Sequence, residues 1–89
     1  MRAFITVIGK DTVGILAKVS QKCSEAGANI TEVTQSVLQD MFAMIMLVDI
    51  EKSTVPLDRL SDDLEKLGDD MGLKIHVMHE DIFNSMHRI

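Results

Sequence analysis

The sequence predicts an α+β domain in which one four-stranded antiparallel sheet carries two helices on the same face. Short β-branched segments alternate with two stretches of helical periodicity, in the order strand, helix, strand, strand, helix, strand. The two central segments, residues 29–38 and 41–50, are separated only by Gln39-Asp40, which is typical of a hairpin. Two strand–helix–strand crossovers joined by a hairpin form the ferredoxin-like βαββαβ sandwich, and residues 81–87 add a short C-terminal helix.

The first half of this pattern is an apolar strand followed by an amphipathic helix. Residues 3–8 are mainly apolar and β-branched, and Gly9 follows them. We predict a helix over residues 12–26, with Asp11 as its N-cap and Gly27 as its left-handed terminator. Its expected apolar stripe is Leu16, Val19, Cys23 and Ala26.

The second half repeats the layout. Residues 51–54 form a polar loop, and Pro56 suits a first helical turn. Apolar residues then recur at spacings of three and four, which predicts a helix: Leu57, Leu60, Leu64, Leu67 and Met71. Gly72 ends this helix, and residues 73–79 return as a strand.

Composition limits the classes of protein to which the chain can belong. Its 89 residues are 46% hydrophobic, so residues 1–89 are expected to form one domain. Such a small domain buries only about two-thirds of the surface of its unfolded chain, which favours self-association. The excess of 14 acidic over 9 basic residues argues against direct nucleic-acid binding. A single cysteine, no recognisable leader and no membrane-length apolar run predict a reduced, cytoplasmic protein with no membrane contact.

The third predicted strand is apolar on both faces, although one face of such a sheet is usually wet. One side carries Phe42, Met44, Met46, Val48 and Ile50, and the other carries Ala43, Ile45, Leu47 and Asp49. The first strand repeats this, with Phe4 and Ile8 opposite Ala3, Ile5 and Val7. We expect the tail helix, through Ile82, Phe83 and Met86, or a second copy, or both, to cover the second face. Alternatively, polar residues keep that face wet, namely Thr6, Glu32, Thr34 and Ser36.

The segment from Gly9 to Ile15 is the main candidate for a binding site. A glycine-bracketed turn before a helix leaves helix-start N–H groups pointing outward, where they suit a small anion or zwitterion. Asn29 returns to the sheet with an amide that both donates and accepts hydrogen bonds. The alternative is structural, with the glycines relieving backbone crowding and Asp11 only capping the helix.

Catalytic and metal chemistry find little support in the sequence. No nucleophile stands next to a candidate base, so we predict no enzyme activity and no cofactor. His76, His79 and His87 lie near Glu80 and Asp81, but the first two are expected on opposite faces of a strand, which argues against a shared metal ion. Cys23 is expected to be a small core residue.

Two motifs resemble those of the ACT domain family, the small modules that sense amino acids in metabolic enzymes and regulators. They are Gly9-x-Asp11-x-x-Gly14-Ile15 and Ala26-Gly27-Ala28-Asn29-Ile30. Residues 79–89 look like the tail of short stand-alone ACT proteins related to regulators of glycine cleavage. The family often has proline where this chain has Val13.

The resemblance implies a ligand between two copies, contacted by the first loop of one copy and the second-strand start of its neighbour. The implied contact residues are Asp11, Thr12, Val13, Gly14, Ile15, Asn29 and Ile30. It implies a non-enzymatic module that binds an amino acid within a homodimer or higher oligomer and signals to a metabolic enzyme or transcriptional regulator. The alternative is a ligand-free protein–protein interaction module that docks on a larger enzyme or regulator.

Overall fold

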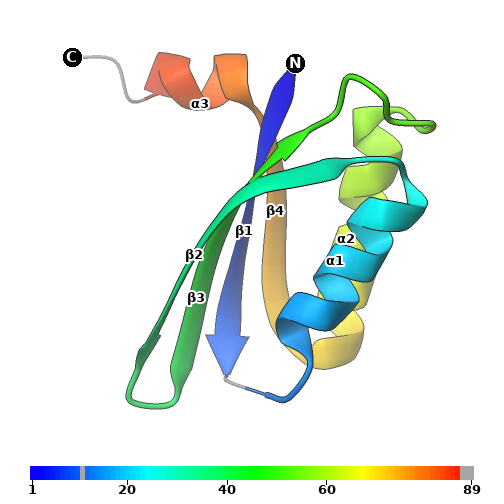
Figure 1. Ribbon diagram of the computed structural model, residues 1–89. Helices are drawn as coiled ribbons and strands as arrows, with labels where there is room; N and C mark the ends of the chain where they lie inside the picture. Colours follow the sequence, from blue (N-terminus) through cyan, green and yellow to red (C-terminus); the bar gives the residue numbers. More distant parts are fainter. Residues whose placement is uncertain (11, 87–89) are drawn as a thin grey trace.

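The sheet of the computed structural model has the strand order β2-β3-β1-β4, and every neighbouring pair is antiparallel (Figure 1). The structure describes residues 1–10 and 12–86. The elements are β1 Arg2–Lys10, α1 Ile15–Glu25, β2 Asn29–Leu38, β3 Met41–Asp49, α2 Leu57–Met71, β4 Leu73–His79 and α3 Glu80–Met86. Helices α1 and α2 lie on one face of the sheet, and α3 lies at the other side (Figure 1). The predicted ferredoxin-like fold is confirmed.

The start of α1 is where the prediction is wrong. The helix begins at Ile15 and not at residue 12, because Gly14 has a left-handed backbone with φ of 87° that no α-helix contains. The predicted N-cap, Asp11, lies outside the described residues. β1 also runs through Gly9 to Lys10, so that glycine does not end the strand.

The buried stripe of α1 also differs from the predicted one. Ile15, Val19 and Cys23 are buried, and Ala26 follows them at the C-cap. Leu16 is exposed, contrary to the predicted stripe, because the row Ile15, Val19 and Cys23 faces the core and Leu16 lies about 100° around the helix from Ile15.

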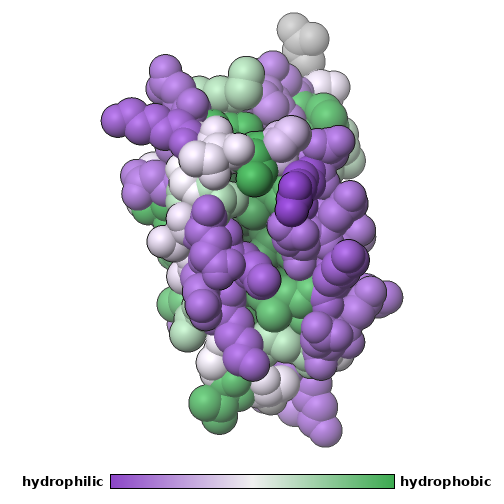
Figure 2. All heavy atoms as spheres, turned by 90° about the vertical axis from the view of Figure 1, so that its right-hand side faces the viewer, coloured by the Kyte–Doolittle hydropathy of each residue, from purple (hydrophilic) through white to green (hydrophobic). Residues whose placement is uncertain are grey.

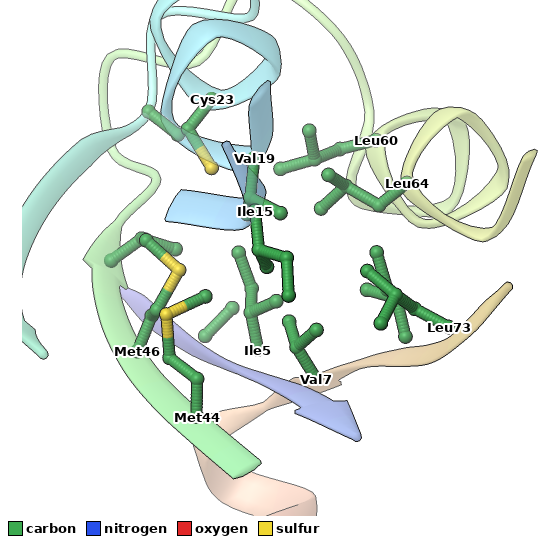
Figure 3. Close-up of a cluster of buried hydrophobic side chains, with 14 of the residues drawn as sticks. Ile5, Val7, Ile15, Val19, Cys23, Met44, Met46, Leu60, Leu64 and Leu73 are labelled. Carbon is green, nitrogen blue, oxygen red and sulfur yellow. The ribbon is translucent and has the colours of Figure 1, made fainter. Parts of the chain in front are cut away.

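The core lies between the helix layer and the sheet, and the buried residues described there are all apolar. Figure 3 shows side chains of β1 and β3 meeting those of α1 and α2. The inward side of β3 is as predicted, with Phe42, Met44, Met46 and Val48 all buried. Helix α2 covers the rest of the sheet face with Leu60 and Leu64. Both are buried, as the spacing of the leucines along α2 predicts.

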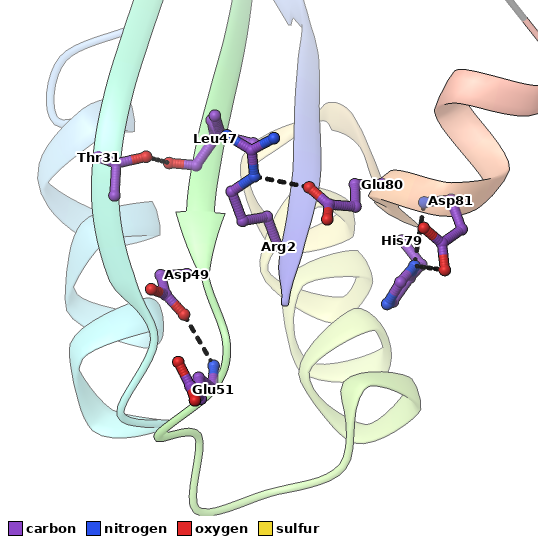
Figure 4. A network of polar contacts seen from close by, with 8 residues as sticks. All are labelled: Arg2, Thr31, Leu47, Asp49, Glu51, His79, Glu80 and Asp81. Carbon is purple, nitrogen blue, oxygen red and sulfur yellow. Dashed lines mark hydrogen bonds and ion pairs between the residues drawn. The ribbon is translucent and has the colours of Figure 1, made fainter.

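Two features shape the β2–β3 hairpin, one near each end of β2. The turn Gln39-Asp40 joins β2 to β3 as predicted, and Gln39 takes a left-handed φ of 59°. β2 also contains a bulge between Ile30 and Glu32, where the pairing with β3 shifts by one residue. Thr31, the extra residue, donates from its hydroxyl to the Leu47 carbonyl at 3.0 Å (Figure 4).

The tail helix covers the second face only in part. The ring of Phe83 stacks on Phe4, so this residue of the tail helix does contact the second face. Ile82 and Met86, predicted to join it, remain more than half exposed, because a seven-residue helix turns only one side to the sheet. The helix spans Glu80–Met86, one residue earlier than predicted, and residue 87 lies outside the described residues.

Candidate ligand-binding site

The loop before α1 presents backbone donors to solvent. Gly14 is the N-cap, and its carbonyl accepts the first helical hydrogen bond from Lys18 N–H at 3.0 Å. The N–H groups of Ile15, Leu16 and Ala17 precede that bond, and no described side chain caps them. Nothing lies within 4 Å of the point where a Gly14 side chain would begin, so a small ligand could approach the backbone closely. A carboxylate suits these donors because the helix N-terminus carries a partial positive charge.

The side chains of this loop divide into two kinds. Val13 is 97% exposed, and Thr12 is exposed with its hydroxyl donating to the Val13 carbonyl at 3.4 Å. Ile15, by contrast, has its side chain in the core, so the group it can offer a ligand is its backbone N–H. The predicted loop residues therefore offer an apolar contact from Val13 and polar contacts from the backbone.

Asn29 is held at the other end of α1 by a glycine-terminated turn. Gly27 has a φ of 77°, and the N–H groups of Gly27 and Ala28 donate to Ser24 and Cys23 carbonyls at 3.0 and 2.9 Å. These two bonds form a Schellman motif, as the predicted left-handed terminator requires. A Cβ on Gly27 would lie 2.9 Å from the Lys52 carbonyl oxygen, so the turn packs against the following loop. The turn delivers Asn29 to the first position of β2 with an exposed side chain.

Two open hollows flank Asn29. The larger, of about 440 Å³, is lined by Ser20, Ser24, Gly27, Ala28, Asn29 and Ile30. The smaller, of about 230 Å³, is lined by Gly27, Asn29, Asp49, Glu51 and Lys52. In the smaller one, the Asp49 carboxylate already accepts a hydrogen bond from Glu51 N–H at 2.9 Å (Figure 4). The larger hollow has two hydroxyls and the Asn29 amide but no carboxylate, so it is better suited to a ligand with a carboxylate.

Sequence reasoning missed Ser20 and Ser24. Their spacing of four residues places both on one side of α1, next to the Gly27-Ala28-Asn29 turn. That spacing is a signal the sequence does contain, since serine is otherwise a poor choice inside a helix.

The two halves of the predicted site do not meet within one chain. Gly14 precedes α1 and Asn29 follows it, and the 11 residues of the helix separate them by about 16 Å. Figure 1 shows the two ends of α1 at opposite ends of the molecule. One copy of the chain therefore carries two half-sites, each of which is open to solvent.

The β2 edge begins at Asn29, in one of the two half-sites. β2 is an outermost strand of the sheet, and among the strands that the structure describes it pairs with β3 alone. Residues 31–40 are all exposed, and neither α1 nor α2 covers the hairpin end (Figure 1). An uncovered edge strand of ten residues offers backbone groups for pairing with another strand.

The remaining chemical candidates are far from this site or buried. Cys23 is completely buried, and its burial raises the pKa of the thiol to about 11. His76 pairs with Thr6 and His79 with Ala3, which places the two histidines on opposite faces as predicted. Within residues 1–10 and 12–86, no group of three or more His, Cys, Asp or Glu side chains is placed to hold a metal ion.

The outer surface of the helix layer is strongly polar. Figure 2 shows hydrophilic side chains in two columns, with an apolar stripe visible between them. Over the described part of the chain, no helix has the length and apolar character needed to span a bilayer.

Comparison with known proteins identifies the family. The family model of the ACT domain matches residues 2–78. A UPF0237 protein of Methanopyrus kandleri is 44% identical over 88 residues, which cover 99% of this chain and 98% of the relative. Among solved structures, an ACT domain protein from Streptococcus pneumoniae has a TM-score of 0.81 and 37% identity over 93% of both chains. A putative glycine cleavage system transcriptional repressor has a TM-score of 0.72 and 27% identity over 85% of this chain and 43% of its own. The chain therefore belongs to the ACT domain family.

Proposed function

We propose that this protein is a non-enzymatic regulatory module that binds an amino acid, or a similar small molecule, between two copies of the chain. The observation that carries the proposal is the separation of the two half-sites at the ends of α1. One half-site offers N–H donors at Gly14, and the other offers the Asn29 amide beside a hollow of about 440 Å³. The similarity to a putative transcriptional repressor supports a regulatory role.

A two-fold arrangement across the β2 edge would join the half-sites. When β2 pairs antiparallel with β2 of a second copy, the start of one strand lies beside the end of the other. The same symmetry makes the α1 helices of the two copies run in opposite directions. The Gly14 loop of one copy then lies at the same end of the assembly as Asn29 of the second copy. In this arrangement the loop donors hold the ligand carboxylate, and the Asn29 amide holds the amino group or a second carboxylate oxygen.

Regulation follows from linkage between binding and assembly. A ligand that contacts two copies binds the assembled form better than the separated form, and it shifts the equilibrium by that difference in affinity. A metabolic enzyme or transcriptional regulator that recognises only the assembled form would then respond to the ligand.

A thermal-shift screen against the twenty amino acids tests the proposal. A ligand present at a hundred times its dissociation constant adds about 2.7 kcal/mol to the free energy of unfolding. For a domain of this size we expect a rise of the melting temperature on the order of 10 °C. The shift should depend on protein concentration, because the site needs two copies.

Two variants separate ligand contacts from general effects on the fold. Asn29→Ala should abolish the shift, whereas Ser36→Ala, another exposed change on β2, should preserve it. Gly14→Ala should also abolish it, and Gly72→Ala is its control, because both glycines have positive φ and open space around them. A shift that survives Asn29→Ala would contradict the assigned site.

The second candidate function is a ligand-free interaction module. It is favoured by the apolar side chains left bare on the sheet face opposite α1 and α2, among them Ile8 and Ile45. Such a module would dock on a larger enzyme or regulator and would show no shift with any amino acid.

A further inference from the structure

Strand β4 forms the edge of the sheet that lies away from β2 (Figure 1). Among the strands that the structure describes, it pairs with β1 alone. Helix α2 packs against it on the helix side of the sheet, and the short α3 follows its last residue. An edge strand offers its outward N–H and C=O groups to an additional strand.

The direction of the backbone groups of β4 follows from the hydrogen bonds of β1. Ile50 N–H donates to the Met1 carbonyl at 3.0 Å, so the odd-numbered residues of β1 bond to β3 and the even-numbered ones bond to β4. His76 pairs with an even-numbered residue of β1, and its N–H and C=O groups therefore point to β1. Ile75 and Val77 alternate with it and direct their N–H and C=O groups outward.

Ile75 is nearly buried, yet its outward backbone groups have no partner. Its exposed fraction is 3%, and no residue that the structure describes bonds to these outward groups. A buried N–H or C=O group without a partner costs free energy comparable to a lost hydrogen bond. An added strand would supply both missing bonds.

A hollow of about 250 Å³, here called the β4 groove, lies along this edge between α2 and β4. It is lined by Glu65, Asp69, Leu73, Lys74, Ile75 and His76. Four of these are consecutive residues of β4, whose side chains alternate between the two faces, so the groove runs along the strand edge. Gly68 allows α2 to approach closely here, because a Cβ on it would lie 2.8 Å from the Leu73 carbonyl oxygen.

The two sides of the β4 groove carry opposite charges. Glu65 and Asp69 lie four residues apart on α2, and both are exposed on the helix side. Lys74 precedes the buried Ile75 and points to the sheet face opposite α1 and α2, here called the open face. None of these three charged groups makes an ion pair with a residue that the structure describes.

We propose that an extended segment of another protein adds to β4 as a further strand, and that lysine or arginine side chains of this segment bind Glu65 and Asp69. The segment runs antiparallel to β4, as every strand pair of the sheet does, and its N–H and C=O groups bond to Ile75 and Val77. Its side chains alternate between the two faces. Basic residues on the helix side therefore alternate with residues beside Lys74, where acidic side chains fit.

A second copy of the chain does not suit this edge. Two-fold pairing of β4 with β4 of another copy would place the two α2 helices side by side. This helix carries six acidic and two basic side chains, and Glu65 and Asp69 of the two copies would face each other. Like charges across an interface suppress association, so the β4 groove favours a segment with basic residues.

The β4 groove is separate from the proposed amino-acid site and does not depend on it. That site uses Asn29 at the start of β2, and β2 and β4 are the two opposite edges of the sheet. A target protein held at β4 therefore leaves the β2 edge free.

Amide hydrogen exchange measured by NMR tests the strand addition. The probe is a synthetic peptide in which lysine and glutamate alternate, and the control peptide has the same composition with the lysines and glutamates in separate blocks. In the free protein, the amides of Ile75 and Val77 should exchange faster than the amide of His76, which bonds to β1. The alternating peptide at ten times its dissociation constant should slow exchange at Ile75 and Val77 about tenfold. The block peptide should have little effect.

Two N-methylated peptides test the register. In an antiparallel pair, directly opposed residues point their side chains to the same face, so the lysines of the peptide should be the residues that bond to Ile75 and Val77. N-methylation of the lysines should therefore abolish binding, and N-methylation of the glutamates should preserve it. An equal or reversed effect would contradict the proposed pairing.

A charge reversal tests the acidic side of the β4 groove. Glu65→Lys should weaken binding of the alternating peptide about tenfold at low salt. Asp70→Lys makes the same change of charge at an exposed position of α2 outside the groove, and it should have a much smaller effect. Circular dichroism checks that both variants are folded.

Three results would overturn the inference. They are no protection of Ile75 and Val77 by the alternating peptide, equal protection by the block peptide, and equal loss of affinity in Glu65→Lys and Asp70→Lys. Protection of the same amides that rises with protein concentration in the absence of peptide would assign the edge to a second copy, and it would overturn the inference as well.

The amino-acid screen separates this inference from the proposed function. An amino-acid shift without peptide protection would reject the β4 groove and retain the ligand site. Peptide protection without any amino-acid shift would do the reverse.

Discussion

Phe83 stacks on Phe4 with an angle of 27° between the rings, and this contact holds the last helix against the first strand. An aromatic pair of this kind contributes about 0.5–1.5 kcal/mol beyond its buried area. We expect Phe83→Ala to lower the free energy of unfolding by about 1 kcal/mol and to detach α3 from the sheet.

Hydrogen exchange and chemical denaturation at low protein concentration measure these two effects. The matched change is Ile82→Ala on the same helix, which should stay within about 0.5 kcal/mol of the wild type because that side chain is exposed. Equal losses in the two variants would show that α3 does not depend on the stacked rings.

Gly27 and Gly72 form a natural pair for testing backbone strain. Their φ values are 77° and 72°, so an alanine at either position would lie in the left-handed region. This should lower the free energy of unfolding by about 1–2 kcal/mol. A Cβ at Gly27 would also lie 2.9 Å from the Lys52 carbonyl, whereas nothing lies within 4 Å at Gly72. The melting temperature of Gly27→Ala should therefore be lower than that of Gly72→Ala in thermal denaturation. The reverse order would mean that the loop at Lys52 moves freely.

The hairpin turn can be improved. Gln39 has a φ of 59°, which glycine adopts without the steric penalty of a side chain. Glycine also loses more conformational entropy on folding, which offsets part of this gain. We therefore expect Gln39→Gly to raise the free energy of unfolding by about 0.5 kcal/mol. Asp40→Gly is the control and should lower it, because no positive φ is found at that position. Urea denaturation of both variants measures the difference.

Cys23 should be unreactive until the protein unfolds. Burial raises the pKa of its thiol to about 11, so almost no thiolate is present at pH 8. We expect thiol reagents to modify the folded protein at the rate of global unfolding, and to modify it rapidly in denaturant. Rapid labelling under native conditions would contradict the buried position.

The same pKa shift predicts a loss of stability at alkaline pH. The folded thiol has a pKa of about 11 and the ordinary value is 9.0, so the folded state holds its proton more tightly. The stabilisation is complete below pH 9 and is lost as pH rises from about 9 to 11. Cys23→Ala should remove this part of the pH dependence in denaturation measured across that range.

Periodicity was enough to predict the elements of this fold. The β-branched strands and the leucines of α2 have one strong pattern each, and right-handed crossovers with short connections leave only a few topologies that join them. The start of α1 was different, because Thr12 and Val13 are compatible with a helix by type and the decisive fact is the backbone angle of Gly14. A glycine permits a left-handed angle but does not demand it, so the sequence could not distinguish a capped helix start from a helical residue.

The candidate site was predictable in its residues but not in its surroundings. The motif around Asn29 places that residue at a strand start, as found. The hollow that Ser20 and Ser24 share with it depends on how α1 crosses β2, which local sequence does not encode. The partial cover of the open face by α3 likewise depends on the angle at which a seven-residue helix leaves β4.

The single extra residue in β2 decides which way the whole edge strand faces. Before the bulge, Ile30 pairs with Val48 and turns inward; after it, Glu32 pairs with Leu47 and turns outward. Side chains alternate strictly along a strand, so if Thr31 were paired with Leu47 in a regular ladder and did not bulge, every residue beyond it would be reversed. Glu32, Thr34 and Ser36 would then point toward the helices, while Val33 and Val37 would turn to the opposite side. The one extra residue thus decides which side chains of β2 face the helices. It allows Ile30 to face the core while Glu32, Thr34 and Ser36 face away from the helices within the same ten-residue strand.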